Sequence, residues 1–176
     1  MSSPSLSAAE IYRRIPHSGA MRLLAGVTFW NDSSIVCSAT SHMEIDNPLR
    51  DNGVLSNVHA LEYAAQAIAV HGSLLMDEAS EPKLERDGSR SDRLQSEIQI
   101  SGDSTRNHLD LVYVATFRGV DMHPGALDQR RGAALTISAT RVAALPNGWN
   151  YEFTVMAQDL VLARGKTVVV ARGVAT

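Results

Sequence analysis

Small and apolar residues recur every three or four positions from residue 58 onward, which is the spacing of one face of an α-helix. Ser56 or Asn57 is placed to cap this helix. Alanines let a helix lie close against a sheet, whereas a solvated helix would carry more lysine and glutamate. The pattern therefore predicts one long, largely buried helix over residues 54–76, wrapped by strands, with the buried face formed by Leu61, Ala64, Ala65, Ile68, Ala69 and Gly72.

Apolar runs on both sides of this helix predict strands. Before it, residues 23–30 and 34–41 form a hairpin around Asn31-Asp32-Ser33, and a short helix-like segment at residues 8–14 opens the chain. One helix followed by a meander of strands makes the chain α+β with an antiparallel sheet. The later strands are residues 94–100, 109–120, 133–145, 151–158 and 160–170, separated by Gly102, Pro124-Gly125, Pro146-Asn147-Gly148 and Arg164-Gly165.

Length and composition set the scale of the fold. A chain of 176 residues is predicted to form a single domain over residues 1–176. Its 44% hydrophobic and 20% charged residues are ordinary globular composition. Residues 77–93 contain hardly any apolar side chain, so they are predicted to form a mobile surface loop.

Charge and cysteine content exclude several classes of function. The formal charge of −3 and a pI of about 6.0 provide no field to attract nucleic acid or an anionic membrane. The single cysteine, Cys37, allows no intrachain disulfide and no cysteine-based zinc site, and is predicted to be a small core residue. No segment has the ~18 apolar residues of a membrane span. Residues 1–9 lack the features of a signal peptide, so we expect a soluble cytoplasmic protein.

Glu62 is the one acidic residue within the predicted helix. A carboxylate among small apolar neighbours must either be paired or have its pKa raised. Such burial suits proton transfer. The alternative is that Glu62 lies on a solvated stripe of the helix together with Gln66, one turn further on.

Two histidines are candidate partners for Glu62. His59 precedes it by three positions on the same helix face, so the two side chains could pair directly. His42 stands at the end of a predicted strand, where a side chain can point into a cleft. Neither histidine has the spacing of a metal-ligand set, and the chain has no phosphate loop, dinucleotide fingerprint or nucleophile elbow. No metal site is predicted.

Three stretches within residues 15–72 carry a family resemblance. Ile15-Pro16-His17, followed by Met21-Arg22-Leu23-Leu24, is similar to an opening Leu-Pro-His segment. A strand ending in His42, with Asn47-Pro48 soon after, is similar to a Gly-His-Phe-Pro-Gly-Asn-Pro turn. Glu62-Tyr63-Ala64-Ala65-Gln66 is similar to a Glu-x-x-Ala-Gln helix. Together they resemble the hotdog-fold 3-hydroxyacyl-acyl-carrier-protein dehydratases, and the helix resembles most the divergent members from aryl-polyene-type gene clusters.

The chain departs from the family pattern around the histidine turn. His42 and Glu62 are twenty positions apart, so the connecting loop is longer than in the typical enzyme. Ser41 stands where the family has glycine, and Asn52-Gly53 replaces the Pro-Gly that usually opens the helix. These departures leave His59 as a rival to His42.

The resemblance implies dehydration of a 3-hydroxyacyl thioester to the trans-2-enoyl thioester, without a cofactor. It implies His42 as the base and Glu62 as the residue that protonates the leaving hydroxyl, supplied across the interface of a homodimer. Gln66, from the same helix motif, is assigned to substrate binding. Backbone amides at the helix start, those of Asn57 and Val58 and less strongly Gly53, are the expected donors to the thioester oxygen.

The expected substrate is carried by acyl carrier protein or by coenzyme A. An acidic carrier protein would need a basic patch, and its possible members are Arg13, Arg14, Arg118, Arg130 and Arg131. Two alternatives remain open at this point. One is a hotdog thioesterase, which uses a carboxylate on the same helix to direct water at the thioester. The other is a non-catalytic hotdog subunit that binds acyl carrier protein or shapes a heterodimer with an active partner.

Overall fold

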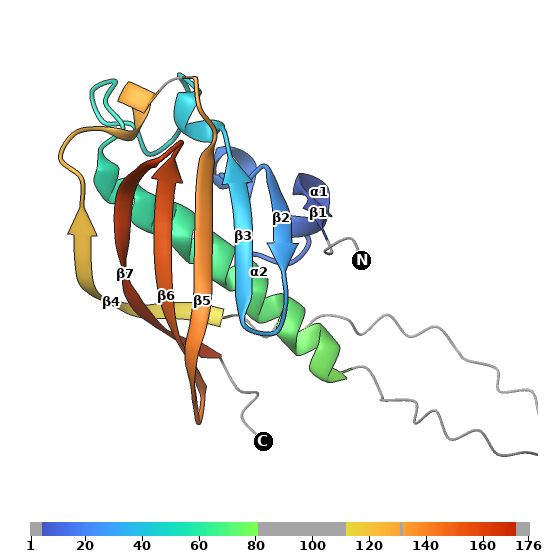
Figure 1. Ribbon diagram of the computed structural model, residues 1–176. Coiled ribbons are helices and arrows are strands. Elements are labelled where there is room, and N and C mark those ends of the chain that lie inside the picture. The colour runs from blue at the N-terminus through green and yellow to red at the C-terminus, as the bar shows by residue number, and fades with distance from the viewer. Residues whose placement is uncertain (1–4, 81–111, 131, 172–176) are drawn as a thin grey trace, which may run out of the picture.

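The computed structural model describes residues 5–80, 112–130 and 132–171. Within these ranges seven strands form one antiparallel sheet in the order β1-β2-β3-β5-β6-β7-β4, and the long helix α2 (Ala60–Ser80) crosses it (Figure 1). The predicted α+β hotdog arrangement is confirmed. The strands are β1 Leu6–Ser7, β2 Gly26–Trp30, β3 Ser34–Ala39, β4 Val112–Met122, β5 Leu135–Leu145, β6 Gly148–Ala157 and β7 Leu160–Ala171. The shorter helical elements are α1 Ala8–Ile11, η1 Gly19–Met21, η2 Ser41–Met43, η3 Asn57–His59 and η4 Leu127–Arg130.

The start of α2 lies later than its predicted boundary. A 3₁₀ turn, η3, precedes it, and the Ser56 side chain caps this turn by accepting a hydrogen bond from the Val58 amide. The preceding residues are not helical, because Val54 pairs with Asp51 and Ser56 forms a bridge with Ala126. At the other end α2 continues to Ser80, so the predicted loop at 77–93 begins too early. Residues 81–93 lie outside the described part.

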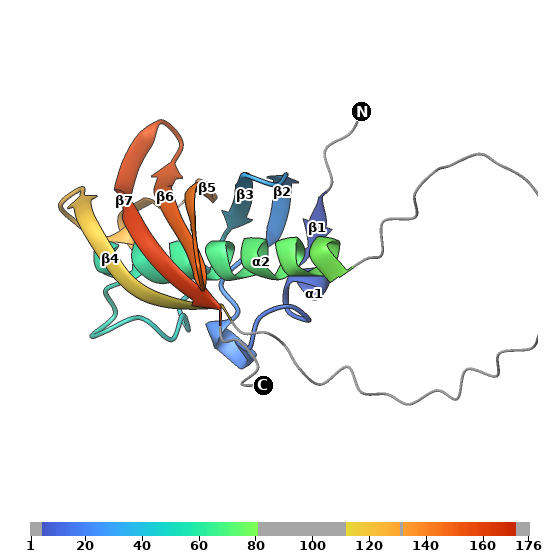
Figure 2. The same cartoon turned by 90° about the horizontal axis from the view of Figure 1, so that it is seen from below.

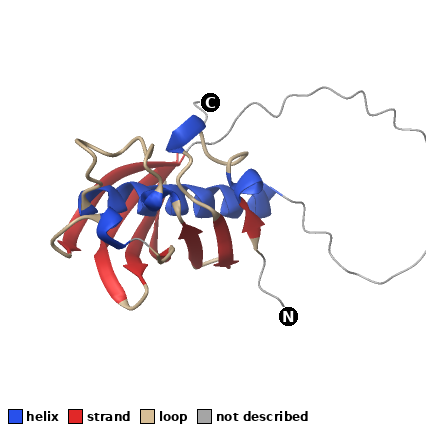
Figure 3. Ribbon diagram, turned by 90° about the horizontal axis from the view of Figure 1, so that it is seen from above, coloured by secondary structure: helices blue, strands red, loops and turns tan. Residues whose placement is uncertain are grey.

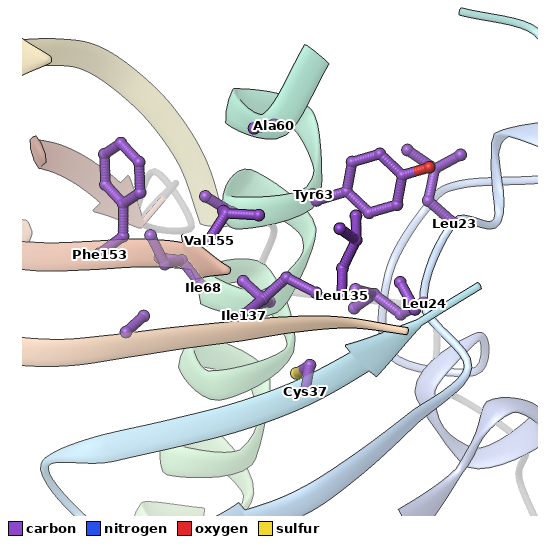
Figure 4. Packing of buried hydrophobic residues seen from close by; sticks show 14 of the residues in the cluster. Leu23, Leu24, Cys37, Ala60, Tyr63, Ile68, Leu135, Ile137, Phe153 and Val155 are labelled. Carbon is purple, nitrogen blue, oxygen red and sulfur yellow. The ribbon is translucent and has the colours of Figure 1, made fainter. Parts of the chain in front are cut away.

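The sheet curves around one side of α2 and buries the small-residue face of the helix (Figure 2). Alternate strand residues point at the helix, as expected for a sheet with one buried face (Figure 4). Each large apolar side chain buried here contributes about 1.5–3 kcal/mol of transfer free energy. Fully or almost fully buried members of this core include Ala60, Tyr63, Ala64, Ala67 and Ile68 of α2, Ile35 and Cys37 of β3, Leu135 and Ile137 of β5, and Phe153 and Val155 of β6. Cys37 is buried in this core, as predicted, and this burial raises the pKa of its thiol to about 12.

Two residues predicted to break the strands lie within strands instead, and glycine packing explains both. Arg164-Gly165 is not a break, because β7 runs through it: a Cβ at Gly165 would lie 3.2 Å from the Phe153 ring, so this glycine allows close packing within a strand. Gly148 begins β6 instead of belonging to the turn, since a side chain there would overlap the Val169 carbonyl. The strand predicted at 94–100 lies outside the described residues.

Figure 3 shows that α2 lies across the strands of the sheet along its whole drawn length. The hairpin of β2 and β3 is confirmed, with Asn31-Asp32-Ser33 at its turn. Of the helices in the described ranges, none combines the length and apolar character that a membrane crossing requires.

Candidate active site

Glu62 lies in the first turn of α2 with its side chain 31% exposed. Its carboxylate oxygen Oε1 is 3.1 Å from Nε2 of His17 and accepts a hydrogen bond of 2.9 Å from Nε2 of Gln66. The carboxylate is therefore paired, which is the first of the two states predicted for an acid at this position. Its histidine partner comes from the loop before η1.

The surroundings of Glu62 favour its charged form. The hydrogen bond with His17 is the largest influence and lowers the pKa of Glu62, while burial opposes it. The hydrogen bond from Gln66 and the charges of His17 and His59 lower this pKa further. Glu62 is thus an ionised carboxylate that remains open to solvent on one side.

Gln66 is fully buried and joins α2 to the segment that carries His17. Its Oε1 accepts a hydrogen bond of 3.2 Å from the Leu23 amide, and its Nε2 donates one of 2.9 Å to the Met21 carbonyl as well as the one to Glu62. The expectation of a solvated stripe shared by Glu62 and Gln66 is therefore wrong. The amide of Gln66, a predicted substrate-binding residue, makes these hydrogen bonds within the chain and so positions Glu62 and the loop that follows His17.

His42 lies in η2, directly after β3, and is fully buried in the chain. Hydrogen bonds anchor its turn to α2. The Ser41 hydroxyl donates to the Leu23 carbonyl (2.8 Å), so the Tyr63 hydroxyl must donate to Ser41 Oγ (2.8 Å). Asn47 Nδ2 then donates to the Tyr63 oxygen (3.1 Å) and to the Ser41 carbonyl (2.8 Å).

In Figure 4 the hydroxyl end of Tyr63 points toward Leu23. Tyr63 is the neighbour of Glu62 in the sequence, and Ser41 is the neighbour of His42. The serine that replaces the family's glycine therefore makes a contact that glycine could not. This contact couples the turn of His42 to the helix of Glu62 within one chain.

His59 lies in η3, half-buried, one turn before Glu62. It acts on Glu62 through its charge, whereas the ion-pair partner of Glu62 is His17. The predicted pairing of His59 with Glu62 is therefore an electrostatic influence.

The backbone amides proposed as oxyanion donors have acceptors within the chain. The Asn57 amide donates to the Gly125 carbonyl and the Val58 amide to Ser56 Oγ, both at 3.4 Å. These are long hydrogen bonds that a stronger acceptor could displace. Gly53 lies on the exposed loop before Val54, in a left-handed conformation with φ of 79° that suits glycine.

A segment of the chain that contains these residues is similar to a known family. Residues 9–84 match the ApeP-like dehydratase family. Its model is described as ApeP-like: ApeP dehydratase. The matched segment includes His17, His42 and Glu62, and the predicted resemblance to divergent hotdog dehydratases is confirmed.

Solved structures with the same architecture support the hotdog fold. The ApeI:P dehydratase heterocomplex from Xenorhabdus doucetiae matches with a TM-score of 0.65 at 22% identity, over 93% of this chain and 91% of that chain. AziG from S. sahachiroi matches with a TM-score of 0.53 at 12% identity, over 86% and 92%. A thioesterase from Haemophilus influenzae also gives 0.53 at 12% identity, over 97% and 96%. No curated protein sequence matches the chain.

The residue that sequence reasoning missed is His17. It belongs to the Ile15-Pro16-His17 stretch that matches the ApeP-like pattern, so a signal was present. Its pairing with Glu62 depends on how Gln66 fastens a distant segment to α2. Local periodicity contains no information on such a contact.

Of the arginines considered for a carrier-protein patch, the three whose side chains are described lie at two different places. Arg13 and Arg14 line a hollow near the end of α2, where Arg14 pairs with Asp77. Arg118 lies on β4 beside a different hollow, opposite Lys166 of β7. The side chain of Arg130 and all of Arg131 lie outside the described residues. Across the described ranges, no group of three His, Cys, Asp or Glu side chains is arranged to hold a metal ion.

Proposed function

We propose that this chain is a hotdog dehydratase subunit that removes water from a 3-hydroxyacyl thioester carried by acyl carrier protein, giving the trans-2-enoyl thioester. The observation that carries the proposal is the ionised, half-exposed Glu62, held by His17 and Gln66 at the start of the buried helix. The dehydratase description of the ApeP-like family supports the reaction class.

The reaction needs a base and an acid on a substrate whose thioester carbonyl is polarised. The base takes a proton from C2, and the electrons of that C–H bond form the C2=C3 double bond as the C3–O bond breaks. The hydroxyl leaves as water once it has received a proton. One proton is removed and one is delivered, so no cofactor or oxidant is required.

We assign the acid role to the pair of Glu62 and His17. Because its pKa is lowered, Glu62 is ionised near neutral pH and cannot supply a proton alone. The proton held between its Oε1 and Nε2 of His17 can pass to the leaving hydroxyl instead. Gln66 keeps the carboxylate oriented throughout this step.

We assign the base to His42 from the other protomer of a dimer, as the family resemblance implies. In this arrangement the acyl chain lies between the two protomers, close to the start of α2. The Asn57 and Val58 amides would then turn from their long internal hydrogen bonds to the thioester oxygen. This assignment requires the turn of His42 to open onto the interface.

One observation favours a second arrangement. His42 is fully buried in the single chain, so this subunit could contribute the Glu62 pair alone and depend on a histidine from a different hotdog subunit. The Xenorhabdus relative is described as a heterocomplex, which is a precedent for two unlike chains. In that case the chain would be inactive when purified alone.

Complementation between two variants separates these arrangements. Glu62→Gln and His42→Ala chains are each tested alone and after mixed refolding, with 3-hydroxybutyryl-acyl carrier protein as substrate and mass spectrometry to detect the enoyl product. If the base comes from the other protomer, each variant is inactive and the mixture recovers activity, because a mixed dimer contains one intact site. An active His42→Ala chain would place the base elsewhere, and an inactive wild-type chain would favour the unlike partner.

The same assay tests the thioesterase alternative. Free thiol is measured beside the enoyl product, on both the carrier-protein and the coenzyme A thioester. We expect enoyl product without thiol release. Thiol released in the absence of any enoyl product would overturn the dehydratase proposal.

A further inference from the structure

Arg50 lies in the long loop between His42 and α2 and binds three backbone carbonyls of that loop. Its Nε donates to the Glu44 carbonyl (2.8 Å), its Nη1 to the Gly53 carbonyl (2.9 Å) and its Nη2 to the His42 carbonyl (3.0 Å). One side chain thus holds the carbonyls of Glu44 and Gly53 at fixed positions relative to the backbone of His42, the proposed base.

The guanidinium is itself held in place by Asp128 of η4. Nη1 of Arg50 lies 2.7 Å from Oδ2 of Asp128, and the two side chains are only 6% and 12% exposed. Burial alone would raise the pKa of Asp128, but the hydrogen bond and charge of Arg50 lower it, so the pair is ionised. A largely buried charge pair with further hydrogen bonds on the arginine has a fixed geometry.

We propose that Arg50 is a positioning residue for His42. The segment between η2 (Ser41–Met43) and α2 (Ala60–Ser80) is long and has only the short turn η3 within it, so it has many conformations to restrict. Arg50 restricts it by fixing the His42 carbonyl relative to the carbonyls of Glu44 and Gly53. The inference rests on the proposed function, because it assumes that His42 takes part in the reaction.

The planar guanidinium is essential to this role. Its donors form a rigid fork that can bind several carbonyls and a carboxylate at once, whereas a lysine ammonium is a point charge on a flexible stem. Lysine at position 50 would keep the ion pair with Asp128 but could not hold three carbonyls in their present places. Position 50 therefore allows charge and geometry to be separated.

The test compares Arg50→Lys, Arg50→Gln and Asp128→Asn with the wild-type protein in the dehydration assay. Arg164→Gln is the matched control, because it removes an arginine–aspartate pair, with Asp121, that is exposed and lies on β7 and β4. We expect Arg50→Lys to lower kcat about 10- to 100-fold, as misplacement of a reacting group does, with KM changed less than about threefold. Asp128→Asn should act mainly on stability, with a lower melting temperature and a smaller effect on kcat. Arg164→Gln should change neither the melting temperature nor kcat.

Hydrogen exchange provides a readout that does not need turnover. Amides of residues 42–53 should exchange faster in Arg50→Lys than in wild type, and those of β5 and β6 should not. If wild type alone makes no enoyl product, the homodimer arrangement of the proposed function fails, while this exchange result still decides whether Arg50 orders the loop. Any one of three results would overturn the inference: a wild-type kcat in Arg50→Lys, unchanged exchange of residues 42–53 in Arg50→Lys, or full activity in His42→Ala. If Arg50→Gln does not fold, the comparison of Arg50→Lys with Asp128→Asn is sufficient.

Discussion

Helix α2 carries two polar contacts that involve histidine, and they differ in exposure. At its first turn Glu62 pairs with His17, and both side chains are partly exposed. About two and a half turns later His71 is fully buried, with Nδ1 at 2.8 Å from the Tyr151 hydroxyl and Nε2 at 2.7 Å from the Asn31 carbonyl. A carbonyl only accepts, so Nε2 carries the proton and Tyr151 donates to Nδ1.

The two contacts differ in charge because they differ in burial and in hydrogen bonding. Burial lowers the pKa of His71 and raises that of Tyr151, so both groups stay neutral. Their hydrogen bond joins α2 to β6, and the hydrogen bond from His71 to Asn31 joins α2 to the β2–β3 turn. Around Glu62 the hydrogen bond from His17 outweighs burial, and the carboxylate is charged. Of these two contacts, only the partly exposed one is open to a substrate, and the proposed function therefore assigns the chemistry to the start of α2.

The largest expected effect comes from removing the charge at this end. Glu62→Gln keeps the shape of the side chain but cannot carry a proton, so kcat should fall about 10²- to 10⁴-fold, the usual contribution of a general acid or base. The measurement is steady-state dehydration with the folded fraction checked by circular dichroism. Glu78→Gln, at an exposed position on the same helix, is the control and should retain full activity. Equal activity in both variants would remove Glu62 from the mechanism.

The buried contact should affect stability and not the reaction. Tyr151→Phe leaves Nδ1 of His71 buried without its donor, which should lower the free energy of unfolding by about 1–3 kcal/mol. Thr140→Val removes a hydroxyl contact that is exposed, between Thr140 and Ser34, and should change it by less than about 0.5 kcal/mol. Urea denaturation of the three proteins gives both values. A smaller loss in Tyr151→Phe than in Thr140→Val would contradict the structural role of the buried pair.

The two contacts also differ in what the sequence revealed. The antiparallel sheet and the burial of one face of α2 could be predicted, because periodicity and turn residues act over a few positions. The predicted face is only partly right: Ala64, Ile68 and Gly72 are buried, whereas Leu61, Ala65 and Ala69 are partly exposed. The paired state of Glu62 could be anticipated from its apolar neighbours. The identity of the partner could not, since His17 reaches Glu62 only after Gln66 has bound the Met21 carbonyl and the Leu23 amide.

Other differences have the same origin in tertiary contacts. Gly165 has the composition of a turn, but in β7 it makes room for the Phe153 ring. The segment before α2 fits a helical pattern, yet Ser56 forms a bridge with Ala126 and delays the helix. The fork of Arg50 depends on Asp128, which is distant in sequence and cannot be connected to it by spacing. Residues that position the site are therefore harder to predict than residues that form the core.

A smaller effect is expected from replacing the partner of Glu62 and keeping the carboxylate. His17→Gln removes the largest influence that lowers the pKa of Glu62, so this pKa should rise. Because a glutamate with a higher pKa can carry part of the proton that the pair had shared, kcat should fall only about tenfold. His59→Gln removes only a more distant charge and should raise the pKa of Glu62 less. Carbon-13 titration of the labelled glutamate carboxyl measures both shifts. A larger shift in His59→Gln would reverse the assignment of the partner.

The smallest effect is a dependence of stability on pH that separates the two ends of α2. The pKa of His71 is lowered in the folded state, so below the ordinary histidine value of about 6.5 the unfolded chain binds more protons, and stability falls as the pH decreases from there. Arg141 adds to the lowering and Asp32 opposes it. One proton contributes at most about 1.4 kcal/mol per pH unit. The lowered pKa of Glu62 acts in another window, because its contribution is present above about pH 4.3 and is lost as the pH falls through its folded value.

Urea denaturation between pH 7 and pH 5 tests the histidine, and difference curves isolate it from the other titrating groups. The wild-type protein should lose stability more steeply than His71→Gln in this range, whereas Glu62→Gln should follow the wild-type slope there and differ from it only below about pH 4.5. Imidazole nitrogen-15 shifts of the folded wild-type protein provide the same information without a substitution that could prevent folding. A His71 ring that protonates in the folded protein at pH 6 would show that burial does not separate the two contacts, and the distinction between a reactive and a structural end of α2 would fail with it.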